Sequence, residues 1–272
     1  MTPNEFKEKL KTLYEAKAAS LAGNGFLAPL RNKAFDAFYK EGFPTTKDEE
    51  WRFTNLAPVL SNNYNCYFEN TEGNVDVESF FRCDIMDLDT YTAVLLNGWF
   101  VYKTAPITKL ANGVIIGSLQ KAFEEYPELI KKHFGKYCDV EKNAFEALNT
   151  AFASDGVFIY VPENVTPDKP IQIINIINKK ENIFIQPRNL VVVDKNSNLS
   201  LVLCDDALSH FPSLNNSVTE IFVDENASID HYKMQNNDNH SSMINNLSFH
   251  QLDHSRVSSN ITTLNGGFIR NN

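Results

Sequence analysis

The sequence lacks the cysteine spacing and the long apolar runs that mark secreted and membrane proteins. Its four cysteines are too far apart for a CxxC metal knuckle or a dense disulfide framework; they are Cys66, Cys83, Cys138 and Cys204. Apolar runs such as 157–161 and 171–177 fall far short of the roughly 20 residues of a membrane helix. Residues 1–10 carry charges where a signal peptide has an apolar core. We therefore expect a cytoplasmic protein that spans no membrane.

Basic residues are also in deficit. The chain has 25 Lys and Arg against 34 Asp and Glu, which gives a formal net charge of -9. Binding to nucleic acid or to an anionic membrane surface needs clustered Lys and Arg, so we expect neither partner. The hydrophobic share of 43% is ordinary for a globular protein, and 272 residues suffice for one large or two ordinary domains. The composition thus predicts a folded chain.

Motifs for nucleotide binding and nucleophilic catalysis are missing as well. The sequence contains no GxxxxGK phosphate loop, no GxGxxG turn and no GxSxG nucleophile motif. A glycine pair at Gly113 and Gly117 lacks the lysine that a phosphate loop requires. We therefore expect any nucleotide chemistry to come from a partner protein.

The first 150 residues combine helical and strand patterns. Apolar spacing predicts helices over residues 3–18, 30–39, 116–134 and 140–152. Two short apolar runs, 91–96 and 99–102, flank Asn97 and Gly98, a pair that tolerates the positive φ of a tight hairpin turn. The polar stretch 61–89 is typical of a loop-rich connection. Residues 1–150 thus predict a mixed, partly helical N-terminal domain.

From residue 151 onward the pattern is all β and weakly repetitive. The segments 161–164, 193–196 and 223–226 each place an asparagine-bearing turn after a strand, at offsets of 32 and 30 residues. A fourth copy, 255–258, matches 227–230 at an offset of 28. Repeats of this length indicate units that stack to bury their apolar faces, as in a β-solenoid. A sandwich of successive hairpins would give a similar alternation and remains the alternative.

The end of the sequence reads as the start of another strand. Residues 266–272 follow the last recognisable repeat and contain no element that could cap a solenoid, whose last coil would otherwise expose apolar surface and strand edges. We therefore expect the natural chain to continue past Asn272. Pairing of this edge with a partner is the alternative.

Three stretches resemble the SufB/SufD family, and the similarity extends over nearly the whole chain. They are residues 46–56 (TKDEEWRFTNL), 186–193 (QPRNLVVV) and 216–235. The first favours the SufD branch over the SufB branch. The resemblance implies a helical N-terminal domain, then a right-handed parallel β-helix, then a helical C-terminal domain that docks the ATPase SufC. For this chain we expect a mainly β protein with residues 151–272 as an incomplete β-helix and the SufC-docking domain absent.

The resemblance also implies a function. Family members act in a SufB–SufC–SufD complex that assembles iron–sulfur clusters, so we expect a non-catalytic scaffold subunit and not an enzyme. The implied partners are a SufB-like subunit and a SufC-like ATPase, with a homodimer as a further possibility. A transient cluster is expected at the level of the complex, with no cofactor bound by this chain alone. The family's cluster-related residues lie beyond Asn272, so no catalytic, cofactor-binding or metal-binding residue is assigned here.

Two groups of candidate site residues have structural explanations that we favour. Glu49, Glu50, Trp51 and Arg52 offer carboxylates beside a guanidinium and an indole, but the segment also suits a short capped helix that packs through its tryptophan. Cys204 ends an apolar run, which favours a buried small side chain over a reactive thiolate.

A histidine pair gives a weak metal hypothesis. His250 and His254 are four residues apart, a spacing that joins one face of a helix, whereas this region predicts strand and turn. Further histidines and acids nearby could add ligands; they are His231, His240, Asp230, Asp238 and Asp253. Polar solenoid turns routinely carry such residues, so we expect no metal here.

The competing functional class is a β-helix enzyme that cleaves acidic polysaccharide. Such enzymes use carboxylates and basic residues on one solenoid face. Here no Lys or Arg cluster accompanies Asp205, Asp206 or Asp224 to bind a uronate, and the chain is acidic. The sequence therefore favours the scaffold.

Overall fold

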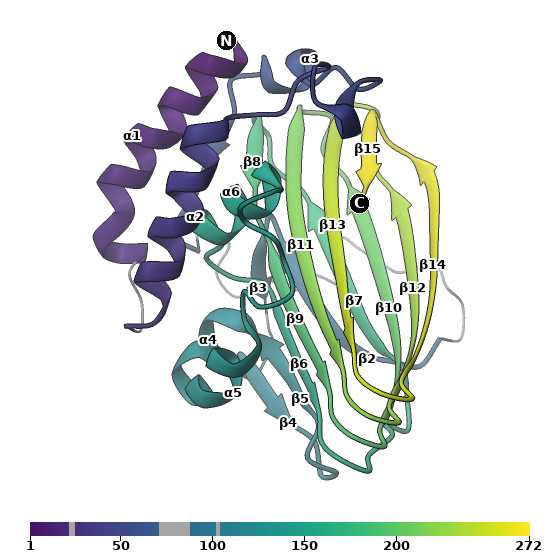
Figure 1. Cartoon of the computed structure of the whole chain (residues 1–272). Helices are drawn as coiled ribbons and strands as arrows, with labels where there is room; N and C mark the ends of the chain where they lie inside the picture. The colour runs from purple at the N-terminus through teal and green to yellow at the C-terminus, as the bar shows by residue number, and fades with distance from the viewer. Residues whose placement is uncertain (22–24, 71–87, 102–103) are drawn as a thin grey trace.

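The computed structural model describes residues 1–21, 25–70, 88–101 and 104–272. The protein is mainly β, with an N-terminal helical region beside a stack of long strands (Figure 1). No helix in these ranges is long and apolar enough to cross a bilayer. The expected fold class, a β-solenoid preceded by a partly helical region, is confirmed.

The two helices expected near the N-terminus are present. They are α1 (Pro3–Leu21) and α2 (Leu27–Glu41), followed by the short η1 (Glu49–Trp51) and α3 (Ala57–Leu60). One stripe of α1 is buried because Phe6, Leu10 and Tyr14 recur at helical spacing. The Tyr14 ring stacks on Phe35 of α2 with centroids 4.0 Å apart. An aromatic core thus joins the two helices.

The prediction of one helix over residues 116–134 is wrong at its start, and the rest of the segment forms two helices instead of one. The segment forms the strand β5 (Ile115–Ser118) and two helices, α4 (Leu119–Glu125) and α5 (Pro127–His133). The Ser118 side chain accepts a hydrogen bond from the backbone N–H of Lys121 and so fixes the start of α4. Pro127 cannot continue a helix, because it lacks an N–H, but it is well suited to the first turn of the next one.

The helix expected over residues 140–152 begins later than predicted. It is α6 (Ala144–Phe152). The side chain of Asn143 caps it by accepting hydrogen bonds from the backbone N–H groups of Phe145 and Glu146. Residues 140–143 therefore lie outside the helix, because an Ncap residue has non-helical backbone angles.

The hairpin expected around Asn97 and Gly98 is confirmed. The strands β2 (Tyr91–Leu96) and β3 (Trp99–Val101) pair antiparallel, and the two turn residues have φ of 51° and 87°. Residues 102–103, and 71–87 of the expected loop-rich stretch, lie outside the described residues. Within that stretch β1 (Asn65–Cys66) forms a short strand.

The β-rich part is a solenoid of parallel strands and not a sandwich of hairpins. Its strands are β6 (Val157–Val161), β7 (Ile171–Ile177), β8 (Ile183–Ile185), β9 (Arg188–Val193), β10 (Asn198–Ala207), β11 (Ser213–Val223), β12 (Ser228–Asn236), β13 (Ser241–Gln251), β14 (Arg256–Asn265) and β15 (Phe268–Asn271). One sheet carries the order β1-β8-β11-β9-β6-β5-β4, extended from β11 by β13 and β15; the other has the order β14-β12-β10-β7-β2-β3. The strands of successive coils pair in parallel. Here β4 is Ile107–Lys109, so five strands from the first 150 residues, β1 to β5, join the two sheets.

The predicted repeat register is confirmed residue by residue. Val161, Val193 and Val223 are neighbours across the first sheet, and Leu199 pairs with Ile229 in the second. The turns after the first sheet place Asn164, Asn196, Asn226 and His254 at φ of 61°, 59°, 56° and 59°. Asparagine tolerates this left-handed conformation better than most residues, which explains its recurrence. Backbone hydrogen bonds from these asparagines to the next coil tie the turns into a ladder.

Candidate functional site

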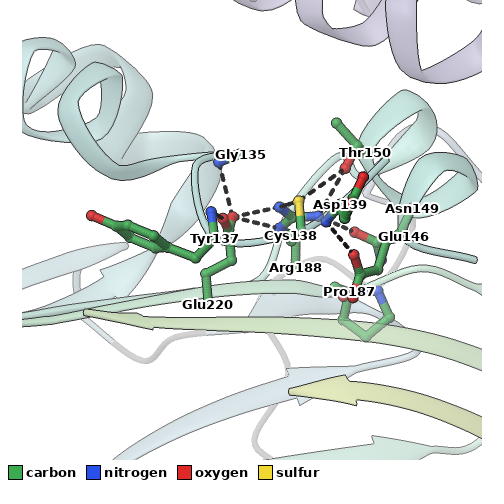
Figure 2. Close-up of polar contacts among 10 residues, drawn as sticks. All are labelled: Gly135, Tyr137, Cys138, Asp139, Glu146, Asn149, Thr150, Pro187, Arg188 and Glu220. Carbon is green, nitrogen blue, oxygen red and sulfur yellow. Dashed lines mark hydrogen bonds and ion pairs between the residues drawn. The ribbon is translucent and has the colours of Figure 1, made fainter. Parts of the chain in front are cut away.

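A buried polar network joins the helical region to the solenoid (Figure 2). Its centre is Arg188 of β9, whose side chain is fully buried and forms an ion pair with the equally buried Glu220 of β11. The Arg188 guanidinium also donates to Asn149 Oδ1 at 3.1 Å and to Thr150 Oγ1 at 3.0 Å, both on α6. It lies 5.0 Å from the centroid of the Phe134 ring.

The Glu220 carboxylate binds the loop that leads to α6. It accepts hydrogen bonds from the backbone N–H groups of Gly135, at 2.9 Å, and Tyr137, at 2.8 Å. Asn149 adds two further links by donating to the backbone oxygens of Pro187 and Asn216. Both charged residues belong to the sequence stretches that resemble the SufB/SufD family. Through these contacts, Arg188 and Glu220 form a structural clamp that holds the helical region against the coils of the solenoid.

Electrostatics keep this clamp charged. Burial by itself would lower the pKa of Arg188, but the adjacent Glu220 carboxylate and Cys138 together raise it. Burial also raises the pKa of the Cys138 thiol, although Arg188 Nη2 lies 3.1 Å from its sulfur. Because a thiol needs a depressed pKa to act as a nucleophile, Cys138 is a packing residue here. The same applies to Cys66, whose pKa burial raises to about 12.

A second buried charge pair lies inside the solenoid. Lys233 of β12 contacts Asp205 of β10 at 3.0 Å and donates to Asn245 Oδ1 at 2.9 Å. Asn175 donates to the other Asp205 oxygen at 3.1 Å. Cys204 is buried beside them, as expected for a small core side chain. Asp205 therefore points into the core and is not on a solenoid surface that a polymer could reach.

The segment around Trp51 packs as the structural interpretation predicts. Trp51 is buried, with its ring centroid 5.4 Å from that of Phe145 and 3.9 Å from the Arg270 guanidinium. Glu49, Glu50 and Arg52 are exposed. The tryptophan thus links η1 to α6 and to the last described strand, β15.

The structure separates the predicted histidine pair. His254 lies in a solenoid turn, whereas the His250 ring stacks on Tyr137 with centroids 4.8 Å apart. His231 is buried, with Nδ1 2.9 Å from Ser259 Oγ. The described part of the chain instead brings together His210, Asp238 and His240. Sequence reasoning missed His210, although its offset of 28 residues from Asp238 equals the offset that pairs Ser213 with Ser241.

Two buried histidines make stability depend on pH. Burial lowers the pKa of both His133 and His231 from 6.5 to about 4. The positive charge of Lys132 adds to the effect at His133, and that of Lys233 adds to it at His231. The folded chain then binds fewer protons than the unfolded chain between these values, so stability falls as the pH falls through that window. We expect the urea midpoint to decline between about pH 7 and about pH 5, and to decline less in His231→Gln.

The comparison between wild type and variant isolates the histidine contribution. The buried carboxyl groups of Glu146 and Asp155 have raised pKa values, because burial disfavours their charged forms, and so they act in the opposite direction. Parallel midpoint curves for wild type and His231→Gln would contradict the prediction.

Comparison with known proteins identifies the family. A model of the SufBD protein N-terminal region matches residues 4–173, and a model of the SufBD core domain of the SUF iron–sulfur cluster assembly system matches residues 175–272. A SufBD family iron–sulfur cluster assembly protein of Synechocystis sp. is 25% identical over 240 residues, which are 85% of this chain and 52% of the relative. Relatives of the same description from Trieres chinensis and Staphylococcus aureus are 36% and 35% identical, each over 46% of this chain and 26% and 27% of their own length.

These matches have two consequences. The chain spans about half the length of its Synechocystis relative and a smaller share of the others. The two family models together extend over residues 4–173 and 175–272, and they meet within β7. The chain therefore belongs to the SufBD family of iron–sulfur cluster assembly proteins.

Proposed function

We propose that this chain is a non-catalytic scaffold subunit, of the SufD type, in a cytoplasmic SufB–SufC–SufD complex that assembles iron–sulfur clusters. The observation that carries the proposal is the match of both SufBD family models to a chain that folds as a parallel solenoid. A solenoid presents long rigid faces and strand edges, which suit it to hold other proteins in place. A SufC-like ATPase would supply the nucleotide chemistry, and the cluster would be held transiently by the whole complex.

The surface for a SufB-like subunit is best supported at β14. Ile261 of β14 is in register with the buried Lys233 of β12 and so faces the interior of the stack. It is nevertheless 38% exposed, because no coil of the described chain covers it. Leu264 on the same strand is 62% exposed. Apolar side chains on an open strand edge favour pairing with another protein or a further coil.

A catalytic role in polysaccharide cleavage finds no support in the geometry. That hypothesis needs carboxylates on an accessible face, and Asp205 is buried in an ion pair with Lys233. The other fully buried pair, Arg188 with Glu220, binds backbone groups and α6 side chains. Both pairs are explained by packing, which fits a scaffold.

Co-purification tests the proposal. We expect the tagged full-length protein, isolated gently and without oxygen from its source, to retain an ATPase and a second solenoid subunit. In a separate pull-down with the 272-residue chain, in which β14 is open, Ile261→Asp should reduce recovery of the solenoid subunit, because a carboxylate at a buried contact is costly. Phe53→Asp is the matched control, since Phe53 is 88% exposed in the helical region. Failure of the wild-type protein to retain either partner, or recovery of a second copy of itself alone, would overturn the proposal.

A further inference from the structure

Two turns of neighbouring coils lie at the upper end of the solenoid in Figure 1. They bring together three side chains of types that can ligate a metal ion. His210 lies in the turn between β10 and β11, and Asp238 and His240 lie in the turn between β12 and β13. The turns stack because Asp206 pairs with Asn236 before them and Ser213 pairs with Ser241 after them. Residues at equivalent positions of neighbouring strands are about 4.8 Å apart, so side chains far apart in sequence come into contact.

The two histidines lie on either side of the Asp238 carboxylate. Asp238 Oδ2 is 2.7 Å from His210 Nδ1, and Asp238 Oδ1 is 2.7 Å from His240 Nδ1. One ligand atom from each residue lies within 4.8 Å of the others. Among the described residues, no other group of three or more His, Cys, Asp or Glu side chains has its ligand atoms this close together.

Asp238 is held firmly while the imidazoles remain free to adjust. Its Oδ1 accepts a hydrogen bond of 2.8 Å from the backbone N–H of His240, and its side chain is 16% exposed. The side chains of His210 and His240 are 84% and 58% exposed. The group therefore offers an anchored carboxylate between two exposed imidazoles.

We propose that His210, Asp238 and His240 bind a divalent first-row transition metal ion of the Zn²⁺ class. Two imidazole nitrogens and one carboxylate oxygen are a ligand set that Zn²⁺ and its neighbours in the series accept. Ligand atoms of a tetrahedral zinc site are about 3.3 Å apart, given bonds of about 2.0 to 2.1 Å. The two separations of 2.7 Å, each to a different Asp238 oxygen, would have to widen by a fraction of an ångström, and the ligand atoms of the two imidazoles already lie within 4.8 Å of each other.

The site leaves a fourth coordination position to water. Three protein ligands with an open position are typical of zinc sites that exchange a ligand, whereas closed structural sites use four protein ligands. Because the site lies on an exposed edge, the ion would be accessible and exchangeable. This inference rests on side-chain geometry alone and does not depend on the proposed scaffold role.

Calorimetric titration of the metal-free protein with Zn²⁺ tests the site. We expect one saturable site, and we expect His210→Ala to weaken its affinity for Zn²⁺ by at least about 100-fold. Loss of a group that only supports a metal ligand costs up to about 100-fold, and loss of a ligand should cost no less. Asp238→Asn should weaken binding comparably while its amide oxygen still accepts the His240 N–H. His254→Asn is the matched control: it removes another exposed turn histidine and installs the residue that Asn226 already provides in the preceding coil.

A second measurement separates this site from other ligands. Co²⁺ bound by nitrogen and oxygen ligands gives visible absorption bands, which we expect in the wild type and in His254→Asn but not in a His210→Ala/His240→Ala variant. Unchanged urea midpoints would show that the variants are folded. Equal Zn²⁺ affinity and equal Co²⁺ spectra in the wild type and the double variant would overturn the proposal, as would a wild type that binds neither ion.

Discussion

Gly156→Ala is expected to abolish folding of the chain, or to lower its free energy of unfolding by more than about 4 kcal/mol. A Cβ atom at this position would lie 1.7 Å from the backbone oxygen of Arg188 and 2.5 Å from its carbonyl carbon. Neither backbone can withdraw, because the N–H of Arg188 donates to Asp155 and the N–H of Leu119 donates to Gly156. The added methyl group therefore clashes with backbone atoms only, and no side chain can move to relieve the clash.

Soluble yield and the urea midpoint measure this effect. Gly25→Ala is the matched control, since a Cβ there meets no heavy atom within 4 Å. It should leave both quantities near those of the wild type. A Gly156→Ala protein with the wild-type midpoint would show that the β6 and β9 backbones are not in the close contact that the structure describes.

Arg188→Met should destabilise the chain by about 3 to 5 kcal/mol, because it leaves the buried Glu220 carboxylate without its countercharge. Arg188 and Glu220 are both fully buried, so water cannot replace the lost partner. The variant also removes the hydrogen bonds to Asn149 and Thr150 that fasten α6 to β9. A shift of the urea midpoint measures the loss.

An exposed ion pair on the same solenoid provides the control. Lys195 and Glu225 also join neighbouring coils, but both side chains are 44% exposed. Lys195→Met should therefore cost no more than about 1 kcal/mol. Adding Glu220→Gln to Arg188→Met should cost much less than the sum of the single changes, because it removes the stranded charge. Equal effects of Arg188→Met and Lys195→Met would contradict the buried clamp.

The solenoid was predictable because its signals are local and repeated. Three successive coils place an asparagine where the backbone turns with positive φ, at Asn164, Asn196 and Asn226, and their strands pair in one register. The hairpin at Asn97 and Gly98 follows from the same turn chemistry. By contrast, residues 116–118 were expected to be helical by spacing yet lie in β5, because pairing with β6 outweighs a weak local preference.

The candidate site was less predictable because it depends on contacts between coils. Sequence reasoning included Asp238 and His240 among many polar turn residues, but it omitted His210, whose partner is 28 residues away. It paired His250 with His254, which the fold directs to different surroundings. Likewise nothing local shows that Arg188 and Glu220 face α6 together, since each lies within an apolar strand pattern.

Local sequence signals account for the repeat, its turns and the alternating burial along strands such as β10 and β12, because backbone sterics and the side-chain period act over a few residues. The sequence also contained the stretches by which the family is recognised. The packing of the folded chain sets where the helices within residues 119–133 begin and end. It also sets which charges are buried as pairs and brings together the turn residues His210, Asp238 and His240. These features arise when one coil stacks on another. Stacking buries residues and brings them into contact although they are far apart in the sequence, and no local pattern encodes such contacts.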